Sequence, residues 1–163
     1  MCRHHHHTRR ATLAMLAAAP LLSACKAEAA GPEDIRWGRE VCAMCGMIIS
    51  DPGFAAEIRG GADRALVKFD DIGDAVHWLQ EQPWKDAADI EFWVRDYGTR
   101  TDWLDARQAH YHDGVMSPMD YGWAALREKT RLTVSFAEMQ TAVLSRGLTW
   151  RCIPGAEEGT HQG

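Results

Sequence analysis

The sequence lacks the marks of several common protein classes. With 18 Lys and Arg against 23 Asp and Glu, it has no excess of basic residues, which a nucleic-acid-binding face would need. The apolar run at 11–22 is too short to span a bilayer. The sequence has no phosphate-binding loop, no Ser-His-Asp arrangement and no obvious pair of catalytic carboxylates. We therefore expect a protein that is not an enzyme.

The N-terminus has the features of an export signal. A basic start, "MCRHHHHTRR", precedes an apolar stretch, and "LSAC" ends at Cys25. Leu-Ser-Ala-Cys resembles a bacterial lipobox, which predicts that residues 1–24 are a signal peptide and that Cys25 is the lipidated first residue. Cleavage at a nearby Ala in an ordinary signal peptide is the alternative. We expect a lipid-anchored periplasmic protein, and Lys26 favours the outer membrane. Residues 25–39 are predicted to be the anchor and a polar tether.

Cysteine is scarce, and its number is informative. Of five cysteines, Cys2 would leave with the signal and Cys25 would carry lipid. The remaining three, Cys42, Cys45 and Cys152, are an odd number in an oxidising compartment, so any disulfide scheme leaves one thiol over. Thiols kept for a metal explain this count better than a disulfide framework does.

Hydrophobic patterning predicts one α+β domain over 40–153, built from two strand–strand–helix–strand units, and a polar tail at 154–163. In the first unit we expect strands at 47–50, 54–60 and 64–69, a helix within 70–82 and a strand at 90–97. In the second unit, 101–112 is extended and 114–122 is a loop. One broken or two short helices follow at 123–147, and a last strand lies at 148–153.

The segment "CAMCGM" (42–47) holds two thiols and two thioethers. Gly46 and strand-like residues follow Cys45, so the helix that activates a thioredoxin-type pair is missing. Structural zinc usually takes two pairs of ligands, and there is no second Cys-x-x-Cys. Cu(I) prefers thiolate and thioether sulfur and would account for Met44 and Met47 as well. Core packing is the alternative for both methionines.

A second candidate region is "HYHDGVMSPMDYG" (110–122). His110 and His112 lie two residues apart, on one side of an expected strand, and either could be a solvated residue or a ligand. Met119 lies in a tight Gly/Pro-containing loop, where a core role is less expected than in a helix. Met116 is expected to pack, and Cys152 to be a buried strand thiol.

Five blocks of sequence, in order, resemble the NosL family, the nitrous oxide reductase accessory lipoproteins that act as copper chaperones. The blocks cover most of the predicted mature chain: the "LSAC" lipobox, "CAMCGMIISDPGFAAEI" (42–58), "VKFDDIGDAVHWL" (67–79), "VRDYGTRTDWLDARQAHYH" (94–112) and "SPMDYGWAALRE" (117–128).

This resemblance implies one Cu(I) held between the Cys-Gly-Met segment and the second unit. By position, Cys45, Met47 and Met119 match family residues, whereas Asp120 stands where the family has Gly. The full set of predicted metal ligands is Cys42, Cys45, Met47, His110, His112 and Met119. The implied function is a periplasmic Cu(I) metallochaperone that delivers copper to nitrous oxide reductase or its assembly machinery. A periplasmic thiol–disulfide oxidoreductase and a zinc-stapled structural lipoprotein are the alternatives.

Overall fold

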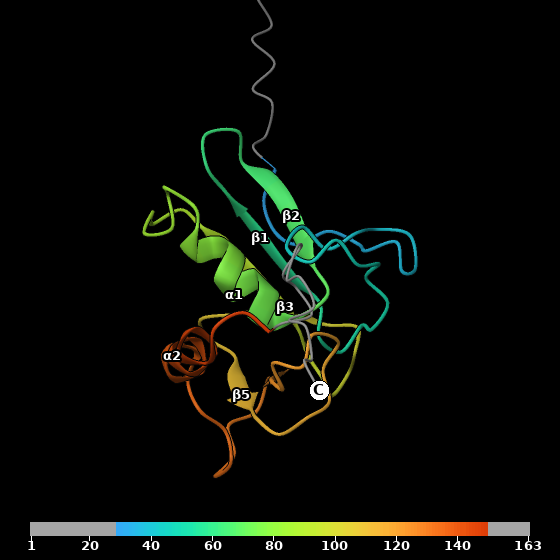
Figure 1. Cartoon of the computed structure of the whole chain (residues 1–163), viewed down its shortest axis with the longest axis vertical. Coiled ribbons are helices and arrows are strands. Elements are labelled where there is room, and N and C mark those ends of the chain that lie inside the picture. Colours follow the sequence, from blue (N-terminus) through green and yellow to red (C-terminus); the bar gives the residue numbers. More distant parts are fainter. Residues whose placement is uncertain (1–28, 150–163) are drawn as a thin grey trace, which may run out of the picture.

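The computed structural model describes residues 29–149, which form two small antiparallel sheets and two helices (Figure 1). The predicted α+β class is confirmed. Strands β1 to β4 form one sheet in the order β2-β1-β3-β4, and β5 pairs with β6 in the other. In chain order the elements are β1 (Ala56–Gly60), β2 (Ala65–Phe69), α1 (Ile72–Gln80), β3 (Glu91–Arg95), β4 (Trp103–Asp105), β5 (His110–His112), β6 (Ala124–Leu126) and α2 (Phe136–Arg146).

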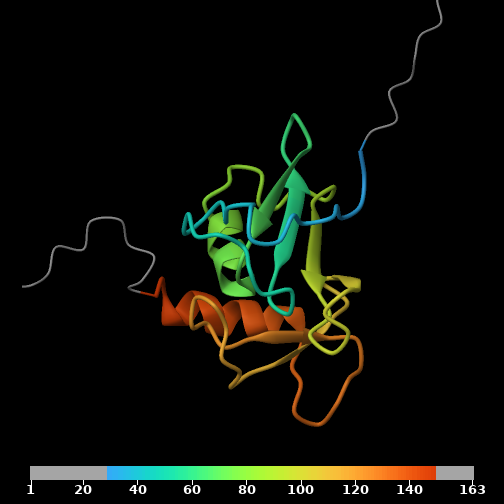
Figure 2. The ribbon, with the colours of Figure 1, turned by 90° about the vertical axis from the view of Figure 1, so that its right-hand side faces the viewer.

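The two helices join the two sheets. Helix α1 packs against β1 and β2 of the larger sheet, and α2 contacts both α1 and β5. Figure 2 shows α2 lying below the four-stranded sheet and beside the two-stranded one. In the part of the chain described, no helix is long and apolar enough to cross a membrane.

Alternating side chains explain how the larger sheet packs. Ile58 on β1 is fully buried among apolar residues of the core that include Phe69 and Val76, whereas Glu57, its neighbour, points to the opposite face because side chains alternate along a strand. Helix α1 begins after Asp71, whose carboxylate accepts a hydrogen bond from the Gly73 amide and so caps the helix. The expected first unit, β1–β2–α1–β3, is therefore present.

The second unit differs from the sequence prediction. The helices expected at 123–147 are wrong in their first half: residues 124–126 form β6, and only residues 136–146 are helical. The reason is tertiary pairing. Ala124 and Ala125 are buried against β5, and the Ala125 carbonyl accepts a hydrogen bond from the Tyr97 amide (2.8 Å), so a helix-compatible sequence is held as a strand. The Ser135 capping box then starts α2.

Two smaller expectations also change. The strand expected at 47–50 is reduced to a single bridge between Val41 and Ile48. The extended stretch 101–112 is divided into β4, which joins the first sheet, and β5, with a turn after Asp105. The last expected strand, 148–153, lies mostly outside the described residues, as do Cys25 and Cys152.

The segment predicted to be a tether packs against the outer face of the larger sheet. The Glu33 amide donates to Glu57 Oε2 (2.8 Å), Lys68 Nζ donates to the Asp34 carbonyl (3.0 Å), and Ile35 is buried. Residues 31–35 therefore pack with the folded part of the chain.

Glu57 is a carboxylate completely buried under this segment. Its Oε1 has no hydrogen-bond partner, and Lys68 Nζ lies 3.8 Å from it. Burial raises the pKa of Glu57 to about 7, because the loss of hydration outweighs the hydrogen bond from Glu33 and the attraction of Lys68. The folded state therefore takes up a proton at Glu57 more readily than the unfolded chain does.

This raised pKa predicts that Glu57 lowers the free energy of unfolding as pH rises. Between the ordinary value of 4.5 and about 7, the folded state binds more protons than the unfolded one, so the free energy of unfolding falls as pH rises. Glu57→Gln removes this dependence. Chemical denaturation gives the free energy of unfolding of both proteins at about pH 5 and about pH 8. Between these two pH values, the variant should gain about 2–3 kcal/mol of stability relative to wild type. Parallel pH profiles for the two proteins would contradict the assignment.

Candidate metal site

The two cysteines lie in a tight turn between the N-terminal segment and β1. The Cys42 amide donates to the Met47 carbonyl (2.8 Å), and the Gly46 amide donates to the Cys42 carbonyl (3.0 Å). Gly46 has φ +75°, a left-handed conformation that glycine adopts without a Cβ clash. The Ala43 amide donates to the Lys68 carbonyl (3.0 Å) and fixes this turn, which we call the cysteine loop (42–47), to β2.

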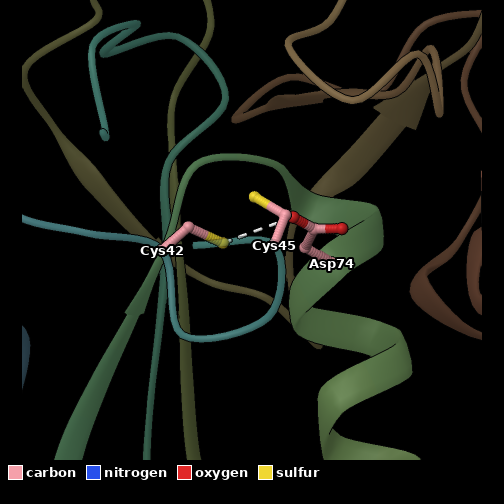
Figure 3. Close-up of side chains that lie close together, drawn as sticks. All are labelled: Cys42, Cys45 and Asp74. Atoms are coloured by element: carbon pink, nitrogen blue, oxygen red, sulfur yellow. Dashed lines mark hydrogen bonds between the residues drawn. The ribbon is translucent and has the colours of Figure 1, made fainter. Parts of the chain in front are cut away.

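Helix α1 brings a carboxylate to the two thiols. Ligand atoms of Cys42, Cys45 and Asp74 all lie within 4.8 Å of one another. The Cys42 thiol donates to Asp74 Oδ2 at 3.3 Å (Figure 3). Asp74 lies in the first turn of α1 and is fully buried. The cluster thus combines residues from a loop and a helix that are 29 or more positions apart in sequence.

The thiols affect each other's protonation. A hydrogen bond from the Cys45 thiol stabilises the Cys42 thiolate and lowers the pKa of Cys42 to about 6. The same hydrogen bond, together with burial and the nearby Asp74, raises the pKa of Cys45. The Cys42 sulfur can thus donate to Asp74 as a thiol or accept from Cys45 as a thiolate, and a metal that binds both sulfurs as thiolates displaces the remaining protons.

Exposure of the sulfur atoms changes along the loop. Cys42 is 1% exposed, Met44 and Cys45 are half-buried, and Met47 is 50% exposed. The predicted ligands Cys42 and Cys45 are brought together. Met47 lies in the same loop and is directly accessible to solvent.

Met119, the predicted ligand from the second unit, is completely buried and belongs to the same apolar cluster as Cys42. Its amide donates to Asp71 Oδ2 (3.0 Å), so its loop is attached to the start of α1. Met116, expected to pack, is instead 91% exposed.

His110 and His112 lie on β5, on either side of the buried Tyr111. Both are partly exposed, and His112 Nδ1 lies 3.5 Å from the Leu132 carbonyl oxygen. Neither histidine joins the cluster of Cys42, Cys45 and Asp74. Their role as ligands stays a prediction.

Asp74 is the residue that sequence reasoning missed. The helix dipole favours an acid at the start of any helix, so its presence there gives no sign of a further role. The available signal was the spacing in "FDDIGD": an acid three residues after the N-cap lies in the first turn, and here that turn is buried on all sides.

Comparison with known proteins gives the following. The sequence model of the NosL family matches residues 37–141. No curated protein matches the chain. The crystal structure of the copper chaperone NosL from Shewanella denitrificans is similar, with a TM-score of 0.51 and 16% sequence identity, over 70% of this chain and 87% of that chain. At this identity the likeness shows a shared fold.

The geometry of the cysteine loop predicts a specific effect of Gly46→Ala. A Cβ at Gly46 meets no atom within 4 Å, so the cost comes from its φ of +75° alone, and we expect about 1–2 kcal/mol of destabilisation. Gly147→Ala is the control, because Gly147 at the end of α2 also has a positive φ (+76°) and open space, and its ψ of −176° makes a Cβ at least as costly there. Titration with Cd²⁺, followed by sulfur-to-metal charge-transfer absorbance, should show weaker binding only in Gly46→Ala. Equal binding by both variants would contradict the loop's role.

Proposed function

The chain belongs to the NosL family, and we propose that it is a metallochaperone that binds one Cu(I) ion and passes it to another protein. The observation that carries the proposal is the convergence of Cys42, Cys45 and Asp74 beside the exposed Met47. A solved structure with the same fold is described as a copper chaperone, which supports the choice of metal.

The donor set favours a soft ion. Two thiols and the thioethers of the cysteine loop are ligands that Cu(I) prefers, and Cu(I) accepts two or three of them. We assign Cys42 and Cys45 as thiolate ligands and Met47 as an exchangeable thioether. Asp74, a harder oxygen donor, accepts the hydrogen bond of the Cys42 thiol before loading, and Cys42 gives up that proton when it binds the ion as a thiolate.

The gradient of exposure suits transfer. Cys42 anchors the ion from inside the domain, whereas Cys45 and Met47 face increasingly toward solvent. A partner can approach from the Met47 side and replace the Met47 thioether with a ligand of its own. The buried Cys42 sulfur then dissociates from the ion last. Such ligand exchange makes or breaks no covalent bond in a substrate, so the protein acts as a carrier and not as an enzyme.

The two alternatives fit the site less well. Structural zinc takes four ligands, and the cluster found among residues 29–149 offers three, one of them a carboxylate. A thioredoxin-type pair lies at a helix N-terminus, whereas Cys42 and Cys45 lie in a turn and the residues after Cys45 are not helical. The oxidoreductase remains an outcome of the experiment below.

Compartment and partner complete the proposal. The signal-like residues 1–24 and Cys25 support export and lipid anchoring in the periplasm, with the outer membrane favoured; they lie outside the described residues. Membership of the family supports nitrous oxide reductase, or its assembly machinery, as the acceptor.

The test is the Cu(I) affinity of two variants, Cys45→Ser and Met47→Leu, in the reduced chain under anaerobic conditions. Competition with a chromogenic Cu(I) chelator should show affinity losses of at least about tenfold for each, since even outer partners of metal ligands cost about that much. Both apo variants should remain folded, because neither residue belongs to the fully buried core.

Met116→Leu is the matched control for Met47→Leu, because Met116 is even more exposed and lies outside the cysteine loop. It should bind Cu(I) like wild type. Wild-type affinity in Cys45→Ser would show that the site is assigned incorrectly. Turnover on protein disulfides that Met47→Leu leaves unchanged would instead favour the oxidoreductase.

A further inference from the structure

Asp71 joins two segments that are far apart in the sequence. Its Oδ1 accepts from the Gly73 amide (2.8 Å) and caps α1. Its Oδ2 accepts from the Ser117 hydroxyl (2.5 Å) and from the Met119 amide (3.0 Å). The side chain is fully buried. One carboxylate therefore holds the start of α1 and the loop at 117–122, which we call the methionine loop.

Further contacts seat the methionine loop on the first turn of α1. The Gly122 amide donates to Ser117 Oγ (3.0 Å), and the Asp120 amide donates to the Ser117 carbonyl (3.1 Å), so the loop curls around Ser117. The Tyr121 ring lies so close to Gly73 that a Cβ there would be 2.1 Å from a ring carbon. Only glycine allows this approach.

The same helical turn holds the cysteine loop. Asp74, three residues after Asp71, accepts the hydrogen bond from the Cys42 thiol. The first turn of α1 thus has one carboxylate for each loop, and the position of Met119 relative to the thiols depends on Asp71.

We propose that Asp71 is a positioning residue that sets Met119 as a buried thioether ligand of Cu(I), joining Cys42, Cys45 and the exchangeable Met47. This inference rests on the proposed function. Asp71 does not touch the ion; it acts through the Met119 amide and Ser117. No other side chain among the described residues hydrogen-bonds to the Met119 backbone.

Asp71→Asn separates positioning from helix capping. Asn is as good an N-cap as Asp, so the bond to Gly73 can persist. The amide NH₂ then faces Ser117 and Met119. The Ser117 hydroxyl can rotate and accept, but the Met119 amide can only donate and loses its partner. The substitution therefore disturbs the methionine loop and leaves the cysteine loop in place.

The experiment is a double-mutant cycle of Asp71→Asn and Met119→Leu in the full reduced chain. Cu(I) affinity is measured by chelator competition, and the sulfur coordination number by X-ray absorption at the copper edge. Each single variant should lose about 10–100-fold in affinity and one sulfur ligand relative to wild type. The double variant should lose no more than Met119→Leu alone, because both changes remove the same ligand.

Ser135→Ala is the matched control, since Ser135 caps α2 through its own side chain and has no contact with the site. It should lower the unfolding temperature without changing the copper coordination. If Asp71→Asn fails to fold, Ser117→Ala replaces it in the cycle, because it removes one attachment of the loop and keeps the cap.

Multiplicative losses in the double variant would overturn the proposal, since Asp71 would then act elsewhere. Unchanged sulfur coordination in Met119→Leu, together with lost binding in Cys45→Ser, would overturn it while the proposed function stands. If both Met119→Leu and Cys45→Ser bound Cu(I) like wild type, the result would contradict the proposed function itself.

Discussion

Three buried carboxylates at the start of α1 fix the loops that form the candidate site. Asp70 accepts from the Ser50 amide (3.2 Å) just after the cysteine loop, Asp71 accepts from Ser117 and Met119, and Asp74 accepts from Cys42. Burying a carboxylate costs free energy unless hydrogen bonds replace its hydration. Here the replacement donors come from two loops that are distant from α1 in the sequence, and the hydrogen bonds hold these loops at the helix. The helix N-terminus also favours the negative charge.

This arrangement has a consequence for the apo protein. Protein groups donate hydrogen bonds to Asp70 and Asp71, so these acids require no metal for their partners, even though burial raises the pKa of Asp70 and that of Asp71 to about 6. Metal sites that form only with the ion present leave the chain unfolded without it. A carrier must instead stay folded before loading and after delivery. The methionine loop is attached to α1 through hydroxyl and main-chain donors, and the cysteine loop is attached to β2 through the Ala43 amide, so neither attachment depends on the metal.

The sequence predicted local features better than tertiary ones. The strands at 54–60 and 64–69 and the helix within 70–82 were predicted from hydrophobic patterning and are present, and the Cys-x-x-Cys spacing pointed to sulfur chemistry. The strand at Ala124–Leu126 was not readable, because pairing with β5 overrides a helical propensity. The role of Asp74 was not readable either. It depends on a tertiary contact between α1 and a loop 29 or more residues earlier, and no local sequence pattern indicates that contact.

The distribution of polarity around the site joins fold and function. Cys42 and Asp74 are enclosed, and Met47 is exposed, so a bound ion is held from one side and accessible from the other. A carrier needs one accessible side to pass its ion to a partner, whereas a structural metal is enclosed by protein ligands on all sides.

The most direct test of this account is an anaerobic titration of the reduced chain with Cu(I) against a chromogenic chelator, with and without excess Zn²⁺. The account predicts tight binding of one Cu(I) per chain that excess zinc does not displace, since the donor set is dominated by sulfur. Displacement by zinc, or loss of Cu(I) to a weak chelator, would contradict the central claim that this site carries copper.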